Sequence, residues 1–87
     1  MTYYVYILLS LKDGKFYIGF TDKLERRLKE HKDGKVDSTK NRRPVRLIFY
    51  EAFSHRADAW RREQYFKTTK GKKTLRLVLR ETLQKYL

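Results

Sequence analysis

The start of the chain constrains the fold more than any other segment. Tyr3 to Leu9 is an almost unbroken run of β-branched, aromatic and aliphatic residues, and such a run predicts a buried strand. Asp13 and Gly14 follow it as a dipeptide that is typical of tight hairpin turns. Phe16 to Phe20 then has the composition of a partner strand. The chain is therefore expected to begin with an antiparallel β-hairpin.

The pairing of these strands separates their side chains onto two faces. A two-residue turn at Asp13 and Gly14 pairs residues whose numbers add to an odd sum, so even residues of one strand share a face with odd residues of the other. One face is then wholly apolar and holds Val5, Ile7, Leu9, Phe16, Ile18 and Phe20. The other face holds Tyr4, Tyr6, Leu8, Tyr17 and Gly19. We expect a core face and a phenol face, on which the glycine leaves room for a backbone or a ligand. The alternative is that the tyrosines simply tolerate a half-buried surface.

Capping and breaking residues divide the rest of the chain. Asp22, with Glu25 three residues later, has the pattern of a capping box, and Ser54 can cap a second helix. Gly34 and Gly71 are expected to end helices, and Pro44 to open a strand. The elements predicted after the hairpin are a helix from Asp22 to about Lys32, a polar basic loop from Asp33 to Arg43, a strand from Val45 to Ala52, and helices from Ser54 to about Thr69 and from about Lys73 to Tyr86.

Length and element order together predict the fold class. The 87 residues suffice for a single domain, over residues 1–87, with a thin core. The order β-β-α-β-α-α predicts an α+β fold, a small α/β sandwich in which three helices cover a three-stranded, largely antiparallel sheet. There is no cysteine to reinforce the core, and no apolar run approaches the ~20 residues of a membrane span. The chain is expected to be cytoplasmic, with no membrane partner.

The first predicted helix places two basic residues beside its buried stripe. At about 100° per residue, Leu24 and Leu28 face the core, and Arg27 and His31 adjoin them on one side. A guanidinium and an imidazole four residues apart suit a phosphate clamp with a titratable neighbour. The alternative is an arginine along the helix rim and a histidine that the helix dipole favours near the C-terminal end.

The second predicted helix contains an acid where burial is expected. Glu63 lies in an arc that four apolar residues bracket: Ala57, Ala59, Trp60 and Phe66. Carboxylates are almost never buried without a partner, so Glu63 is either the helical partner of Lys67 or a metal ligand. The last predicted helix has only the spacing of a core-packing helix, in Leu75, Val78, Leu79, Thr82, Leu83 and Tyr86.

Charge is the strongest global feature. Lys and Arg number 22 against 10 acidic residues, which gives a formal net charge of +12. The cations are distributed from Lys12 to Lys85 and do not form a tail. A folded domain with this field attracts polyanions in a salt-dependent way. Nucleic acid of some kind is therefore the expected partner; the alternative is a surface that serves solubility or nonspecific association with ribosomes.

Several short motifs, in this order, resemble the GIY-YIG nuclease family. Tyr4-Val5-Tyr6 corresponds to the first motif, with Tyr and Val in place of the family's Gly and Ile, and Tyr17-Ile18-Gly19 is the second motif intact. The segment Leu24 to His31 is similar to the family's helix, in which an arginine precedes a His or Tyr by four residues. Glu63 matches the family's metal-binding glutamate. The resemblance extends from Tyr3 to about Leu79, and it is strongest to small stand-alone members and to the incision domain of the excinuclease C subunit.

The resemblance implies a metal-dependent endonuclease that hydrolyses phosphodiester bonds, in DNA repair or processing, with DNA favoured over RNA as the partner and with no small-molecule cofactor. Glu63 would hold one Mg²⁺ or Mn²⁺, and Arg27 would bind the scissile phosphate. Tyr17 or His31 would orient or deprotonate the water, with Tyr6 as a hydrogen-bonding support. A tyrosine base at pH 7 needs about 4 kcal/mol of help, because its pKa is near 10, whereas a histidine needs none.

Seven further cations are candidates for contacts with the nucleic-acid backbone. They are Lys35, Lys40, Arg42, Arg43, Lys70, Lys72 and Lys73. For each of them the alternative is a solvated charged surface. For the whole chain the alternative is a non-catalytic basic nucleic-acid-binding module on the same fold. Glu63 favours the enzyme, since pure binding gains nothing from an anion that faces phosphate.

Overall fold

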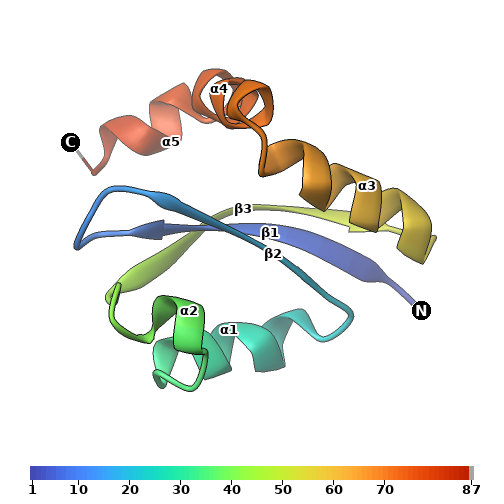
Figure 1. The fold of residues 1–87 in the computed structure, drawn as a ribbon, viewed down its shortest axis with the longest axis horizontal. Helices are drawn as coiled ribbons and strands as arrows, with labels where there is room; N and C mark the ends of the chain where they lie inside the picture. Colours follow the sequence, from blue (N-terminus) through green and yellow to red (C-terminus); the bar gives the residue numbers. More distant parts are fainter. Residues whose placement is uncertain (87) are drawn as a thin grey trace.

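The computed structural model describes residues 1–86 and confirms the α+β class (Figure 1). Within these residues, three strands and five helices follow one another in this order: β1 (Tyr3–Ser10), β2 (Phe16–Thr21), α1 (Leu24–Lys32), α2 (Asp37–Lys40), β3 (Val45–Phe53), α3 (Arg56–Phe66), α4 (Thr69–Val78) and α5 (Arg80–Gln84). None of these helices has the length and apolar character needed to cross a bilayer.

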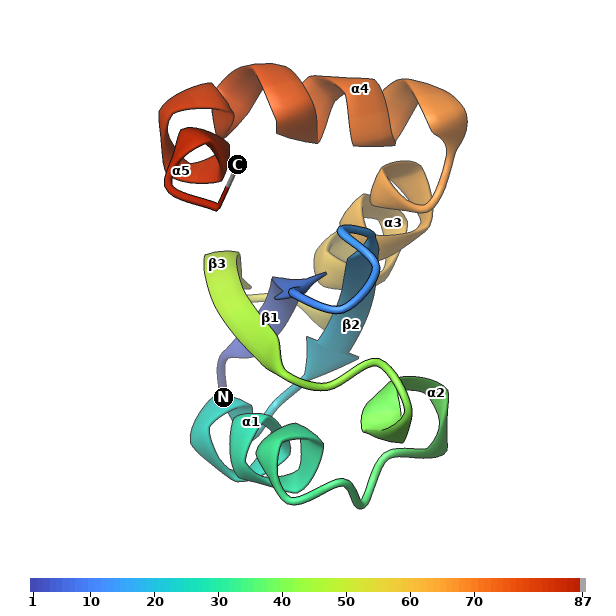
Figure 2. The same cartoon turned by 90° about the vertical axis from the view of Figure 1, so that its left-hand side faces the viewer.

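The three strands form one antiparallel sheet in the order β2-β1-β3, so β2 and β3 are its edges. Helices α3, α4 and α5 lie on one face, and α1 and α2 lie on the other (Figures 1 and 2). The apolar core fills the first side, where the buried residues are Val5, Ile7, Ile18, Ala59, Phe66, Leu75 and Leu79. The second side buries polar groups as well, and the candidate site lies there.

The hairpin keeps the predicted faces although the predicted turn length is wrong. Tyr6 pairs with Gly19 and Leu8 with Tyr17, so the connection is longer than two residues. Ser10 N–H donates to Lys15 O at 3.0 Å, and Gly14, with φ of +71°, donates to Ser10 O at 2.8 Å. The numbers of paired residues still add to an odd sum in this register, and therefore each side chain lies on its predicted face.

Several helix boundaries differ from prediction. Neither predicted cap is used, because α1 follows Lys23 with no side-chain cap and His55, not Ser54, caps α3 by accepting from Ala57 N–H. The loop from Asp33 to Arg43 contains the short helix α2. Gly71 does not break a helix, because it lies inside α4, where a Cβ would overlap the backbone of Tyr65. The chain turns instead at Thr68, whose side chain caps α4 by accepting from Gly71 N–H. The last predicted helix is thus two helices, which meet at Leu79.

The inward side of α3 is narrower than predicted. Ala59 and Phe66, seven residues apart and therefore on one side of the helix, are buried in the core. Trp60 is 56% exposed, and Ala57 is also exposed, so neither brackets a buried arc. In the α4–α5 region Val78 and Tyr86 are exposed as well, because the helix ends at Val78 and changes direction there.

Candidate active site

Three polar side chains between the sheet and α1–α2 form a hydrogen-bonded relay. Tyr6 Oη lies 2.8 Å from His31 Nε2, and His31 Nδ1 lies 2.7 Å from Thr39 Oγ1. Thr39 donates its own proton to Val36 O at 3.4 Å. Thr39 therefore accepts from His31 Nδ1–H, and His31 Nε2 accepts from the Tyr6 hydroxyl. The relay of Tyr6, His31 and Thr39 fixes one tautomer of the neutral imidazole.

Burial keeps the relay neutral. Tyr6 and Thr39 are 0% exposed and His31 is 1% exposed. Burial, with the guanidinium of Arg27 as the second cause, lowers the pKa of His31 from 6.5 to about 4. Burial also raises the pKa of Tyr6, an effect that Arg27 only partly offsets. Both ring nitrogens of His31 are hydrogen-bonded to protein side chains, so neither is left to bind a water.

Gly19 makes room for the relay. It lies opposite Tyr6 in the strand pairing, and a Cβ at this position would overlap the Tyr6 ring. The space expected for a backbone or ligand is thus filled by a phenol of the chain itself. Tyr17 packs edge-on against His31 with ring centroids 5.0 Å apart, and it is only half-buried. Tyr17 is therefore the cluster's phenol with access to solvent.

Arg27 joins this cluster to a hollow at the Thr21 end of β2. Its Nη1 donates to Glu30 Oε1 at 3.1 Å. Burial acts to lower the pKa of Arg27, but the neighbouring Tyr6 and Glu30 outweigh it and raise that pKa, so the guanidinium stays charged. The hollow, of about 290 Å³, also contains Arg56 from the start of α3. A phosphate group can reach Arg27 from this side.

Glu63 lies on α3, and therefore on the face of the sheet opposite α1 (Figure 1). Its carboxylate is 3.2 Å from Lys67 Nζ, and its side chain is 14% exposed. Among residues 1–86, no hydrogen bond or ion pair joins Glu63 to the relay, to Tyr17 or to Arg27. The structure thus gathers four of the five predicted catalytic residues and pairs the fifth with its helical neighbour.

Of the residues predicted to contact the nucleic-acid backbone, Arg42 has a structural role. It donates to the carbonyl oxygens of Lys15 and Phe16, each at 3.2 Å, and pairs with Asp13 at 3.1 Å. These bonds tie the segment before β3 to the hairpin. The guanidinium of Arg42 is therefore largely occupied by the chain itself.

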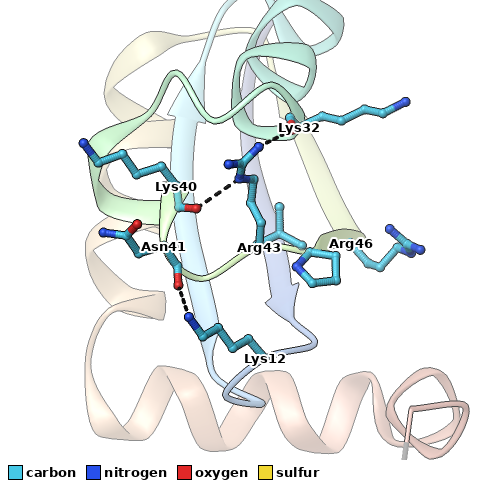
Figure 3. Close-up of a pocket in the computed structure, with 8 residues that line it drawn as sticks. Lys12, Lys32, Lys40, Asn41, Arg43 and Arg46 are labelled. Atoms are coloured by element: carbon cyan, nitrogen blue, oxygen red, sulfur yellow. Dashed lines mark hydrogen bonds between the residues drawn. The ribbon is translucent and has the colours of Figure 1, made fainter.

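Arg43 is held at the centre of a basic hollow of about 550 Å³ (Figure 3). It donates to Lys40 O at 3.0 Å and to Lys32 O at 3.2 Å. Lys12, Lys32, Lys40 and Arg46 surround it. Lys40 also pairs with Asp37 at 3.4 Å, and Lys35 is exposed nearby in the chain.

The last three predicted contacts lie at the start of α4. Lys70 and Lys73 are exposed, and Lys72 is half-buried. Lys72 lines a hollow of about 410 Å³ together with Lys15 and Arg76. Of the three, Lys72 is thus the one that lines this hollow.

Thr39 is the residue of the cluster that sequence reasoning missed. It lies in a polar segment in which Ser38 and Lys40 are exposed. Nothing in this local pattern distinguishes the buried threonine from its neighbours. The Thr39 side chain points inward because α2 forms a single helical turn there, and α2 has no side-chain cap that the sequence could indicate.

Comparisons with known proteins identify the family. A family profile described as the GIY-YIG catalytic domain matches residues 2–76. The UPF0213 protein YazA from Bacillus subtilis is 45% identical over 69 residues, which are 78% of this chain and 70% of that protein. A UPF0213 protein from Clostridium perfringens is 37% identical over 82 residues, which are 93% and 87% of the two chains. The solution NMR structure of a UPF0213 protein from Bacillus halodurans has a TM-score of 0.58 and 38% identity, and covers 90% of this chain and 85% of that one.

The fold, the net charge and the family profile over residues 2–76 together define a small basic domain of a nuclease class. The chain belongs to the GIY-YIG family, which is a family of nucleases. Within that family it is similar to the UPF0213 proteins named above.

Proposed function

We propose that this protein is a divalent-metal-dependent endonuclease that hydrolyses phosphodiester bonds in DNA, in repair or processing. The observation that supports this most is that one buried relay contacts both Tyr17 and Arg27. A phenol with access to water and a permanently charged guanidinium are thereby held side by side. The net charge of +12 supplies attraction for a polyanion.

The roles follow from charge and exposure. Hydrolysis of a phosphodiester requires a positioned water and neutralisation of the charge that develops on the phosphate. Arg27 binds the scissile phosphate, and Tyr17 orients the attacking water. His31 and Tyr6 act as positioning residues, because they are buried and neutral. Of the two candidates for the residue that contacts the water, exposure favours Tyr17 over His31.

Glu63 is the carboxylate that the family resemblance assigns to the metal, and in the structure its ion pair is with Lys67. Among residues 1–86, no three His, Cys, Asp or Glu side chains gather into a ready-made metal cluster. Mg²⁺ nevertheless binds through one carboxylate when water and substrate oxygens complete its shell. The Lys67 partner of Glu63 has a side chain that is 50% exposed and can turn to solvent. When bound, the ion would supply charge stabilisation for the departing oxygen.

A non-catalytic nucleic-acid-binding module is the second candidate, and the pair of Glu63 with Lys67 favours it. An acid that a lysine already neutralises, on the face of the sheet opposite α1, agrees with a structural role. Such a module would retain the fold and the charge, and would bind nucleic acid without cleaving it.

Cleavage assays on duplex, branched and single-stranded DNA and RNA, with Mg²⁺, Mn²⁺ or EDTA, test the proposal. We expect metal-dependent cleavage by the wild type. Glu63→Gln should reduce it by orders of magnitude, since the amide keeps the size of the side chain but removes the anion. Affinity for nucleic acid in EDTA should hold or rise, because a negative charge has gone. Thermal unfolding should change little.

Lys67→Gln is the matched control, because it breaks the same ion pair and keeps the carboxylate. If the pair is only structural, both variants lose ~0.3–0.5 kcal/mol of stability and neither loses cleavage specifically. Unchanged cleavage by Glu63→Gln would therefore exclude the metal-ligand role. A wild type that binds but cleaves no substrate in either metal would favour the binding module.

A further inference from the structure

Two arginines stack on phenylalanines at opposite ends of the edge strand β2. Arg56, at the start of α3, has its Cζ 5.3 Å from the ring centre of Phe20. Arg76, on α4, has its Cζ 5.5 Å from the ring centre of Phe16. The two phenylalanines are four positions apart on β2, which is about 13 Å along a strand. The same arrangement therefore occurs twice along one edge of the sheet.

Neither stacked arginine has an acidic partner. Among residues 1–86, no ion pair or side-chain hydrogen bond involves the guanidinium of Arg56 or Arg76. Five other arginines do pair with carboxylates: Arg27, Arg42, Arg61, Arg62 and Arg80. The aromatic ring holds a stacked guanidinium in place and leaves its N–H donors unbonded. A planar fork that is already positioned, with no carboxylate to displace, suits a phosphate group.

The hollow beside Arg76 is cationic. Lys15 and Lys72 line it together with Arg76 and Arg42, and no acidic residue lines it. Arg42 is paired with Asp13, so the three other cations supply its uncompensated charge. This hollow lies at the Phe16 end of β2.

The hollow beside Arg56 has a similar character at the Thr21 end. Arg26 and Arg27 line it from α1. Glu30 and Asp22 also line it, and Glu30 is paired with Arg27. Three arginines against two acids leave a net positive charge at this end as well.

We propose that the nucleic-acid backbone runs along the β2 edge, with one phosphate beside Arg56, another beside Arg76 and the bond to be cut between them. This inference rests on the proposed function, because it gives the substrate's path over the same site. Tyr17 follows Phe16 on β2 and lies within the span, with its side chain on the opposite face of the strand from the two phenylalanines. Arg27, on the same side of the sheet as Tyr17, lines the hollow beside Arg56. One strand of B-DNA has a phosphate every ~3.4 Å of helix axis and also winds around that axis, so two phosphates ~13 Å apart are only a few nucleotides apart. A mononucleotide or inorganic phosphate is too short to occupy both ends.

The basic hollow around Arg43 is the competing surface. It is larger than the other two, but Arg43 itself is bound to two carbonyl oxygens (Figure 3). Its strand residues, Val45 and Arg46, belong to β3, which is the opposite edge of the sheet from β2. This hollow therefore offers a control surface of similar charge at the other edge of the sheet.

The test compares two double variants that remove the same charge. Arg56→Gln/Arg76→Gln changes the β2 edge, and Lys32→Gln/Arg46→Gln changes the control surface. Fluorescence anisotropy with a short labelled DNA duplex in EDTA measures affinity without cleavage, across a salt titration. The first variant should bind about tenfold more weakly or worse, with a salt slope smaller by about 2, because two phosphate contacts are lost. The second should change both quantities only slightly.

Equal losses in the two variants would mean diffuse attraction and would overturn the proposal, as would a larger loss in the control. Arg56→Lys/Arg76→Lys keeps the charge but removes the planar fork, so its affinity should lie between those of the wild type and the glutamine variant. A loss there as large as in the glutamine variant would mean lost packing and would also overturn the proposal. Failure of the proposed function is a separate result. If the wild type never cleaves but the Arg56→Gln/Arg76→Gln variant binds more weakly, the binding path would be supported and the nuclease activity would not.

Discussion

A histidine near the end of a helix is usually exposed, and the helix dipole favours its charged form. His31 has that position without the charge, since it is 1% exposed and its pKa is lowered to about 4. The sequence predicts its place beside Arg27 on the helix. Its burial depends on Thr39 and α2, which supply a partner for Nδ1. A single residue's role is thus set by a neighbour from a segment with no recognisable pattern.

We predict that the free energy of unfolding decreases as pH falls from about 6.5 to 4. The unfolded chain binds a proton at His31 with a pKa near 6.5, and the folded chain only near 4, so the unfolded state holds more protons in this window. The stabilisation is complete above pH ~6.5, and the loss reaches about 3 kcal/mol as the pH passes through 4. Urea unfolding at a series of pH values measures it.

His31→Gln is the control for this prediction, because an amide can still bond Tyr6 but does not titrate. Its unfolding free energy should be nearly flat between pH 6.5 and 4. Asp13 and Asp33, whose pKa values are lowered by hydrogen bonds to Lys15 and Lys29, contribute in both proteins and at lower pH. A wild-type profile as flat as that of the variant would contradict a buried neutral histidine.

At the scale of elements, the sequence predicts the face on which each strand side chain lies better than it predicts the length of the turn. The faces of β1 and β2 depend on whether the numbers of paired residues add to an odd or an even sum. That sum is odd both in the predicted register and in the observed one, although the connection between Ser10 and Lys15 is longer than predicted. The sequence predicts helix ends less well. Glycine commonly ends a helix, but Gly71 lies inside α4 at a close contact with α3. The difference lies in Tyr65, whose backbone leaves no space for a Cβ at Gly71.

The junction of α3 and α4 gives a prediction in which packing opposes propensity. Gly71→Ala improves helix propensity by about 1 kcal/mol, but the new methyl group would overlap the Tyr65 carbonyl. We expect a net loss of about 1–3 kcal/mol, because overpacking costs more than propensity returns. Thr68→Ala, which removes the cap on Gly71 N–H, should cost about 1 kcal/mol. Chemical denaturation measures both.

Lys73→Ala is the reference substitution for this junction, since Lys73 is exposed on the same helix and should change stability by less than about 0.5 kcal/mol. A stabilising Gly71→Ala would show that α3 and α4 can separate without cost. In that case the close approach of the two helices would not limit the choice of residue at position 71.

At the scale of the whole molecule, the sequence predicts which side of its own helix a residue occupies, but not which face of the sheet that helix covers. Tyr6, Tyr17, Arg27 and His31 meet because α1 covers the phenol face. Glu63, to which the family resemblance gives a role at the same site, is on a helix that covers the core face (Figure 2). Arg56 and Arg76 have no sequence pattern at all, since the stacking that relates them is formed by two helices against one strand.

The last prediction concerns the charge of the whole domain. The hollows at the two ends of β2 together hold six cations outside the structural Arg42: Arg26, Arg27, Arg56, Lys15, Lys72 and Arg76. Six phosphate contacts give a slope of log affinity against log salt of about −5, and so a loss of about 10³-fold between ~50 and ~200 mM salt. Anisotropy titrations with two duplexes of equal length and permuted sequence measure the slope and the sequence preference together. The two duplexes should agree within about threefold, because backbone contacts do not distinguish bases. A slope near −1, or binding that requires one of the two sequences, would contradict backbone recognition by this surface.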